Sequence, residues 1–294
     1  MIIDAHHHLW DPAARSHAWL DALPALRRRF GLDDLEAAAV PLGVTSGVLV
    51  QVLPDVSETE DFLARAAASH AAGGTGGGGG AGGGAVPVAG VVGWVDLCGE
   101  DVASEIARIR EQAGGDRLAG VRHLVQDEPD PAWLDRPEVR RGLRAVGQAG
   151  LVYDLLIRPP QLPAALRLTA DLDQVRFVLD HAAKPRISDG VLEPWAAMIG
   201  ELAARPNVAC KVSGLVTEAG AGWRREQFGP YVDVLLASFG PGRLLFGSDW
   251  PVCLLAATYA EVLALARDLL SPHLSPPELD AFFAANARSL YGLT

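Results

Sequence analysis

The chain of 294 residues is 49% hydrophobic and 21% charged, so it can bury a sizeable core and is not a disordered chain. Its formal net charge of −11 argues against nucleic acid and anionic membranes as partners, because phosphate groups attract the opposite charge. Three scattered cysteines, and no basic segment followed by an apolar leader, predict a cytoplasmic protein with free thiols.

The first segment, MIIDAHHH, is predicted to be a strand. Side chains of a strand alternate between its two faces, so Asp4, His6 and His8 are expected on one face. His7 then points the other way and is expected to be structural. A pair of histidines on one strand face can hold a metal ion or contact a polar substrate oxygen, and a solvated polar strand end is the alternative.

Seven further strand-like segments follow, and a helix-like segment comes after each strand. The strands are expected within residues 43–53, 86–97, 118–126, 150–157, 174–184, 207–215 and 243–252. The helices are expected to start near residue 33 and to cover about 60–72, 102–113, 137–149, 162–172, 193–205, 225–239 and 258–270. Near-continuous apolar strands are typical of parallel sheets. The pattern predicts a single-domain (β/α)8 TIM barrel over residues 1–294, with a doubly wound sheet as the competing architecture.

Residues 73–85 form a glycine-dominated tract between two of these units. The tract leads into a strand and does not open a helix after one, so it is not expected to bind a dinucleotide. Its glycines are poor helix formers, which argues against a membrane span. We expect a flexible insert there.

Polar or amphipathic residues stand at the end of every predicted strand, where the active site of a (β/α)8 barrel forms. They are His6 and His8, Gln51, Trp94 and Asp96, Arg122 and His123, Tyr153 and Asp154, His181 and Lys184, Lys211 and Ser213, and Asp249 and Trp250. Arg122 and His123 cannot both point inward along a regular strand, and His123 is preferred. Trp10, Trp94 and Trp250 offer flat surfaces that suit a sugar ring, although tryptophan is more often a core residue.

Several of these motifs resemble the amidohydrolase superfamily, and more closely its amidohydrolase-2 branch. They are DAHHHLWDP at the first strand, LDHAAKP, CKVSGL, FGSDWP at the last strand, and the final NARSLYGL. The resemblance covers the chain apart from the glycine tract. Because the branch includes sugar-acid lactonases and pyrone-dicarboxylate hydrolases, the resemblance implies a hydrolase that opens L-fuconolactone or a related aldonolactone.

Two departures from the superfamily bear on a metal cofactor. Binuclear members carry a bridging lysine or glutamate at the end of strand 4, and metal-dependent members usually carry a histidine at the end of strand 5. The corresponding segments here are VRHLV and VYDLL, so a binuclear centre is not expected. One zinc ion held by His6, His8 and Asp249, and catalysis without a metal, both stay open, because catalytic zinc needs three protein ligands and a water.

Lactone hydrolysis needs an activated water, a donor for the developing oxyanion and an acid for the leaving alkoxide. Asp249 is the predicted base, and His6, His8 and His181 are predicted to polarise the carbonyl group. The predicted substrate-binding residues are Trp10, Gln51, Trp94, Arg122, His123, Tyr153, Lys184, Lys211 and Trp250. Three alternatives stay open: a zinc-dependent decarboxylase of an aromatic or muconate-type acid, a pyrone-dicarboxylate-type hydrolase, and an inactive barrel that binds a partner. Either a monomer or a homodimer is compatible with the sequence.

Overall fold

The computed structural model describes residues 1–73 and 86–294. The glycine-rich insert predicted at residues 73–85 lies outside these ranges apart from Gly73, with which α2 ends. Within the described part of the chain, no helix is both long enough and apolar enough to cross a membrane.

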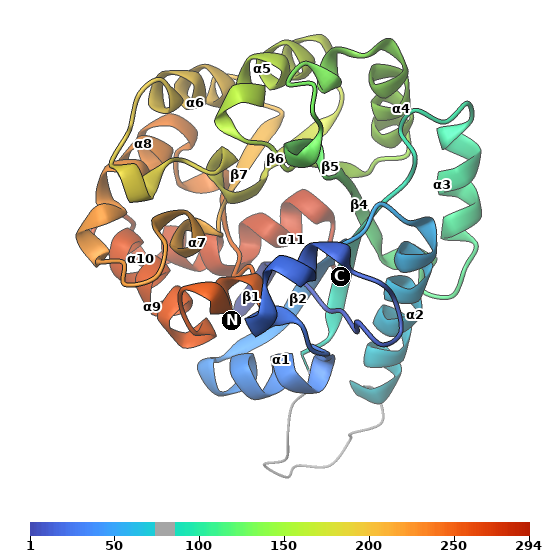
Figure 1. Ribbon diagram of the computed structural model, residues 1–294, viewed down its shortest axis with the longest axis horizontal. Coiled ribbons are helices and arrows are strands. Elements are labelled where there is room, and N and C mark those ends of the chain that lie inside the picture. Colours follow the sequence, from blue (N-terminus) through green and yellow to red (C-terminus); the bar gives the residue numbers. More distant parts are fainter. Residues whose placement is uncertain (74–85) are drawn as a thin grey trace.

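Eight parallel strands lie side by side in chain order and are surrounded by helices (Figure 1). They are β1 (Ile2–His7), β2 (Val44–Val50), β3 (Val88–Gly93), β4 (Leu118–His123), β5 (Val152–Leu155), β6 (Arg176–Leu179), β7 (Val208–Val212) and β8 (Leu244–Phe246). The segment after β8 closes the ring, because the N–H of His8 donates to the Trp250 carbonyl at 2.7 Å and the N–H of Asp249 donates to the His6 carbonyl at 2.8 Å. The predicted (β/α)8 barrel is confirmed.

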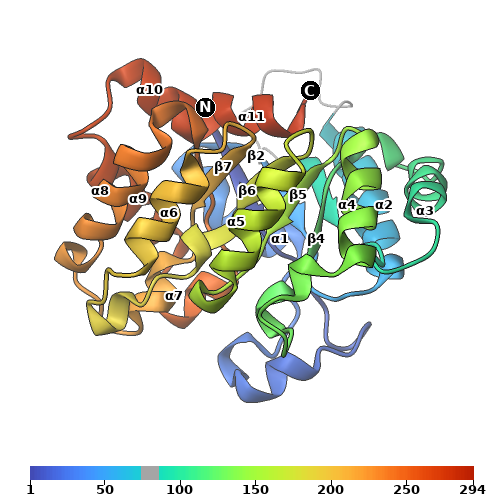
Figure 2. The same cartoon turned by 90° about the horizontal axis from the view of Figure 1, so that it is seen from above.

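A helix follows each strand, close to where the sequence predicts it. These helices are α1 (Leu32–Ala39) before β2, then α2 (Val56–Gly73), α3 (Val102–Arg110), α4 (Pro137–Gln148), α5 (Leu162–Asp171), α6 (Trp195–Ala203), α8 (Gly229–Phe239) and α9 (Tyr259–Leu270). Three short helices are absent from the prediction: α7 (Leu215–Ala219), α10 (Pro276–Asp280) and α11 (Asn286–Tyr291). In Figure 2, α11 lies on the same side of the barrel as both chain ends.

The barrel interior has an apolar floor and a charged layer above it. The floor is made by inward-facing side chains of the strands, among them Ile3, Val152, Val178 and Leu245, which pack with Ala287 and Tyr291 of α11. Two residues further along β4 to β7, the inward positions carry Arg122, Asp154, Asp180 and Lys211, and we call these four residues the charged layer. A separate, larger core fills the space between the strands and the helices.

The predicted alternation along β1 is wrong at Asp4. In the β1–β2 ladder Asp4 pairs with Gly47 and His7 pairs with Leu49, so β1 contains one extra residue, which is a β-bulge. Before the bulge, Asp4 faces away from the barrel axis and accepts hydrogen bonds from the hydroxyl groups of Ser248 (2.6 Å) and Tyr259 (2.9 Å). After the bulge, His6 faces the interior. Asp4 therefore anchors the segment after β8 and does not share the site with His6.

Candidate active site

Three histidines and one aspartate meet above the charged layer, and we call them the histidine–aspartate cluster. The Nε2 atoms of His6 and His8 are 3.1 Å apart. The Asp249 Oδ1 atom lies 3.5 Å from His8 Nε2 and 3.8 Å from the Nε2 atoms of both His6 and His181. All four side chains are buried. The structure thus brings together the four residues that the sequence predicts as the catalytic set.

Unusual backbone conformations place two members of this cluster. The four consecutive residues His181 to Lys184 have φ between 51° and 58°, and Asp249 has φ 57°. Residues other than glycine are strained in this left-handed region by about 1–3 kcal/mol each, and such strain concentrates at functional sites. The His181 ring is further fixed by the Ser213 hydroxyl group, 2.9 Å from Nδ1. The strained turns after β6 and β8 therefore hold imidazole and carboxylate against each other.

The charged layer lies directly beneath His6. The Lys211 Nζ atom is 2.6 Å from Asp154 Oδ2, 2.9 Å from Asp180 Oδ1 and 3.0 Å from His6 Nδ1. Arg122 Nη1 donates to Asp180 Oδ2 at 3.0 Å. Two cations and two carboxylates can be buried together because each charge is paired. No role is predicted from the sequence for Asp154 or Asp180. The available signal is that each follows an inward-facing valine by two residues.

The preference for His123 over Arg122 as the inward-facing residue is wrong. Arg122 points inward, where its Nε donates to Gln51 Oε1 at 3.0 Å. The His123 ring stacks on Trp133 with centroids 4.3 Å apart and lies 2.8 Å from Glu128 Oε1 through Nε2. Its face of β4 is shared with Val121, which belongs to the outer core. Gln51 is fully buried, and its side-chain and backbone oxygens both accept hydrogen bonds from Arg122.

Tyr153 also faces away from the cluster. Its ring packs edge-on against Phe177 with centroids 6.2 Å apart, in the outer core. Its hydroxyl group is buried and has no hydrogen-bond partner among the described residues. The predicted contact of Tyr153 with substrate does not fit this position.

Two of the three tryptophans predicted to meet a sugar ring are core residues. Trp10 is 5% exposed, donates from Nε1 to the Leu26 carbonyl at 3.1 Å and packs edge-on against Phe30. Trp250 is 2% exposed and packs against the same phenylalanine. Trp94 is half-buried and donates from Nε1 to His123 Nδ1 at 3.0 Å. Only Trp94 thus keeps an open surface near the strand ends.

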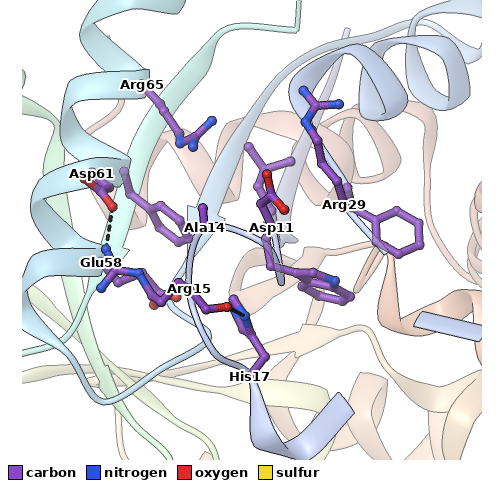
Figure 3. Close-up of a pocket in the computed structure, with 13 residues that line it drawn as sticks. Asp11, Ala14, Arg15, His17, Arg29, Glu58, Asp61 and Arg65 are labelled. Atoms are coloured by element: carbon purple, nitrogen blue, oxygen red, sulfur yellow. Dashed lines mark hydrogen bonds and ion pairs between the residues drawn. The ribbon is translucent and has the colours of Figure 1, made fainter. Parts of the chain in front are cut away.

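A small cavity next to Trp10 is not a sugar site (Figure 3). Arg15 pairs with Asp61 of α2, Arg65 lies on the same helix, and Arg29 lies on the opposite side of the cavity. Its volume of about 70 Å³ is well below the roughly 300–1,000 Å³ of typical ligand pockets.

A cleft of about 640 Å³ opens over the loops after β5, β6 and β7. Its lining includes Arg158, Lys184, Arg186, Trp195, Met198 and Glu218. Burial lowers the pKa of Lys184 and raises the pKa of Glu218, and the charge of Asp249 acts on both groups. Lys184 stands three residues after His181 in the same turn, so the cleft borders the segment that carries this histidine, and it has the size of a ligand pocket.

The protonation states of the cluster suit a base surrounded by neutral imidazoles. Burial lowers the pKa of His181 to about 4 and also lowers the pKa of His6 and His8. Burial alone would raise the pKa of Asp249, but the neighbouring His181 and His8 outweigh it, so this pKa lies below its usual value. At neutral pH Asp249 is a carboxylate among uncharged histidines.

The cluster has the spacing of a zinc site. A tetrahedral zinc ion with bonds of about 2.0–2.1 Å keeps its ligand atoms about 3.3 Å apart, close to the separations of 3.1–3.8 Å found here. A histidine ligand also directs its second ring nitrogen to an acceptor. His8 does so, with Nδ1 2.8 Å from the Val50 carbonyl, and His181 Nδ1 faces the Ser213 hydroxyl. His6 Nδ1 lies 3.3 Å from Asp180 Oδ1, which is also an acceptor. The donor atoms of His6, His181 and Asp249 all lie within 4.8 Å of one another, so these three residues are a donor set that fits one zinc ion.

The chain is similar to known enzymes in both sequence and structure. The amidohydrolase family, in its second group, matches residues 3–293. The chain is 37% identical to an L-fucono-1,5-lactonase of Burkholderia ambifaria over 98% of this chain and 94% of that protein. It is 36% identical to an L-fucono-1,5-lactonase of Burkholderia multivorans over 99% of this chain and 96% of that protein. A crystal structure of an amidohydrolase from Burkholderia multivorans with bound zinc has a TM-score of 0.88 at 36% identity and covers 100% of both chains.

Proposed function

The chain belongs to the amidohydrolase family, and we propose that it opens L-fucono-1,5-lactone, or a sugar lactone of closely related shape, to the free acid. It is a hydrolase that acts on the ester bond of a sugar lactone. The observation that carries the proposal is the meeting of Asp249 with three neutral imidazoles beside the cleft. The two lactonase relatives favour this reaction over decarboxylation or pyrone hydrolysis, and the complete cluster favours an enzyme over an inactive barrel.

We propose that Asp249 is the base. Its carboxylate takes a proton from a water molecule, whose oxygen forms the new bond to the lactone carbonyl carbon. His181, whose Nδ1 can accept from the Ser213 hydroxyl group, then carries its proton on Nε2 and donates it to the carbonyl oxygen as negative charge develops there. The ring C–O bond then breaks, and Asp249 returns the proton to the leaving alkoxide. One water is thereby added across the ester bond.

Lys184 and Glu218 line the cleft next to Asp249, and we propose that they bind the ring hydroxyl groups of the lactone. Zinc, when held by His6, His181 and Asp249, would supply a Lewis acid for the carbonyl group. Whether turnover needs zinc or proceeds without it is decided by the experiment below. A cytoplasmic location and a monomeric or homodimeric state stay predictions.

The test is a pH-stat screen of sugar 1,5- and 1,4-lactones, run with and without a chelator. We expect turnover of L-fucono-1,5-lactone, and a loss of about 10³-fold or more in kcat for Asp249→Asn, the range that a general base contributes. Asp96→Asn is the matched control, because Asp96 also follows a strand but caps the exposed Cys98 N–H outside the cluster. Wild-type activity of Asp249→Asn would refute the base, and a protein inactive on every sugar lactone would refute the substrate class.

A further inference from the structure

We propose that Arg158 and Lys184 bind the carboxylate of the opened sugar acid in the cleft that borders the His181 turn. The inference rests on the proposed function, because it names where the product of that reaction binds once the ring has opened. Such a site distinguishes the product from the substrate. The lactone is neutral, whereas the acid that forms from it carries a negative charge at neutral pH.

Three charged side chains line the cleft without a partner from the protein. They are Arg158, Lys184 and Glu218. None of the three makes a side-chain hydrogen bond or an ion pair with another residue of the described chain. Lys184 and Glu218 are half-buried, and a charge that loses water without gaining a partner is costly. These groups therefore indicate a polar, charged ligand that completes them.

The other two charged residues that line the cleft do have partners. Arg186 Nε donates to Asp189 Oδ2 at 2.7 Å. The Glu193 carboxylate accepts from the Ala197 N–H at 3.2 Å, in the first turn of α6. The groups without a partner are thus two cations and one carboxylate, so positive charge is in excess among them. This balance favours an anionic ligand over a neutral one.

Lys184 lies close enough to both Asp249 and Arg158 to be affected by their charges. Burial lowers the pKa of Lys184, the charges of Glu218 and Asp249 raise it, and the charge of Arg158 lowers it further. Burial raises the pKa of Glu218, and the charges of Lys184 and Arg158 oppose that rise. Lys184 also belongs to the strained turn that carries His181. The cations of the cleft therefore begin beside the cluster and continue to Arg158.

Ring opening creates a second carboxylate next to Asp249. In the proposed reaction Asp249 ends as a carboxylate, and two neighbouring carboxylates repel each other. Lys184 and Arg158 attract the new carboxylate instead. A guanidinium group stays charged and forms strong hydrogen bonds with carboxylates. We therefore expect the product to leave Asp249 with its carboxylate toward Arg158, and to be held there until it dissociates.

The experiment measures the affinity of the full-length protein for two ligands by isothermal titration calorimetry. L-fuconate is the acid formed from L-fucono-1,5-lactone, and L-fucitol has a CH2OH group in place of the carboxylate. We expect Arg158→Gln to weaken the binding of L-fuconate by about tenfold, the effect of one hydrogen bond to a charged group, and to change that of L-fucitol less than about twofold. Arg158 is exposed, so its replacement should leave the fold intact.

Arg186→Gln is the matched control. Arg186 lines the same cleft, but its guanidinium group is already paired with Asp189. Both affinities should stay at the wild-type value in this variant. In the lactonase assay, Arg158→Gln should need about tenfold more L-fuconate for half-inhibition, with KM for the neutral lactone changed less than about twofold.

Three results would overturn the inference. They are a wild-type protein that binds L-fuconate no more tightly than L-fucitol, an Arg158→Gln protein that binds L-fuconate as the wild type does, and equal losses in the Arg158→Gln and Arg186→Gln variants. The calorimetry needs no turnover, so the two proposals can fail separately. If no sugar lactone is hydrolysed while L-fuconate still binds through Arg158, the proposed function fails and the carboxylate site stands.

Discussion

Replacement of Gly214 by alanine tests whether the position of the His181 ring controls turnover. Gly214 follows Ser213 at the end of β7 and has φ +65°, in the left-handed region. A Cβ atom added there would lie 2.6 Å from His181 Nδ1 and 2.7 Å from its Cγ. The substitution therefore pushes on the ring without touching its chemistry.

The size of the effect follows from these distances. Ordinary van der Waals contact begins at 3.4 Å, so the ring must retreat by about 3.4 − 2.6 = 0.8 Å and give up its 2.9 Å contact with the Ser213 hydroxyl group. A misplacement of about 1 Å near a reacting group costs about 10²-fold in rate. Left-handed strain of about 1–2 kcal/mol and overpacking of about 1–3 kcal/mol add to the loss in the free energy of unfolding.

Gly43→Ala provides the control for backbone strain alone. Gly43 has φ 83° and ψ 18°, in the same left-handed region as Gly214, and no atom lies within 4 Å of the added Cβ. We expect it to lose about 1–2 kcal/mol in urea denaturation and to keep the wild-type kcat, whereas Gly214→Ala loses about 10²-fold in kcat. Wild-type kcat in Gly214→Ala would refute the role of His181. Equal losses in both variants would assign the effect to strain.

Two further predictions test the protonation states of His181 and Asp249 and the position of Tyr153 away from the cluster. The pKa of His181 is lowered to about 4 and that of Asp249 lies below its usual value, so both groups keep their working forms as pH falls from 7 to about 5. The pH profile of kcat at saturating lactone should therefore be flat over that range and fall only near pH 4, and an acid limb near the ordinary histidine value of about 6.5 would contradict this assignment. Tyr153→Phe should leave kcat unchanged and raise the free energy of unfolding by up to about 1 kcal/mol, because it removes a buried hydroxyl group without a partner. A loss of activity measured for this variant would restore Tyr153 to the substrate site.

The barrel could be predicted from sequence because each strand and helix carries its own local signal. Apolar runs mark strands that are buried on both faces, and the amphipathic segments between them mark the helices. The orientation of single residues was less predictable, because a bulge depends on the pairing partner. Gly47 and Leu49 of β2 are two positions apart in the chain, whereas their partners Asp4 and His7 of β1 are three positions apart. No feature of β1 alone reveals this difference.

The histidine–aspartate cluster was predictable because its members stand in motifs at strand ends. The charged layer was not, because its role depends on partners from four strands that meet only after the barrel closes. Asp180, next to His181, is an example: its pairing with Lys211 and Arg122 joins segments 31 and 58 residues away in the chain. The predicted sugar contacts of Trp10 and Trp250 are wrong for a different reason. A sequence does not distinguish an aromatic ring open to substrate from one such as Trp10 that is packed edge-on in the core.

The charged layer also explains how His6 can stabilise negative charge from a buried position. Lys211 lies 3.0 Å from one ring nitrogen of His6, and Arg122 lies 3.2 Å from the other. Two fixed cations therefore flank the His6 ring, and they favour negative charge next to the ring without any reorganisation when that charge appears. Asp154 and Asp180 balance these cations, which makes their burial tolerable before substrate binds. The residue types of the layer thus serve stability and the proposed chemistry together. Removal of Asp180 would leave Arg122 without its carboxylate partner, and removal of Asp154 would leave Lys211 and Arg122 sharing one carboxylate beneath the site.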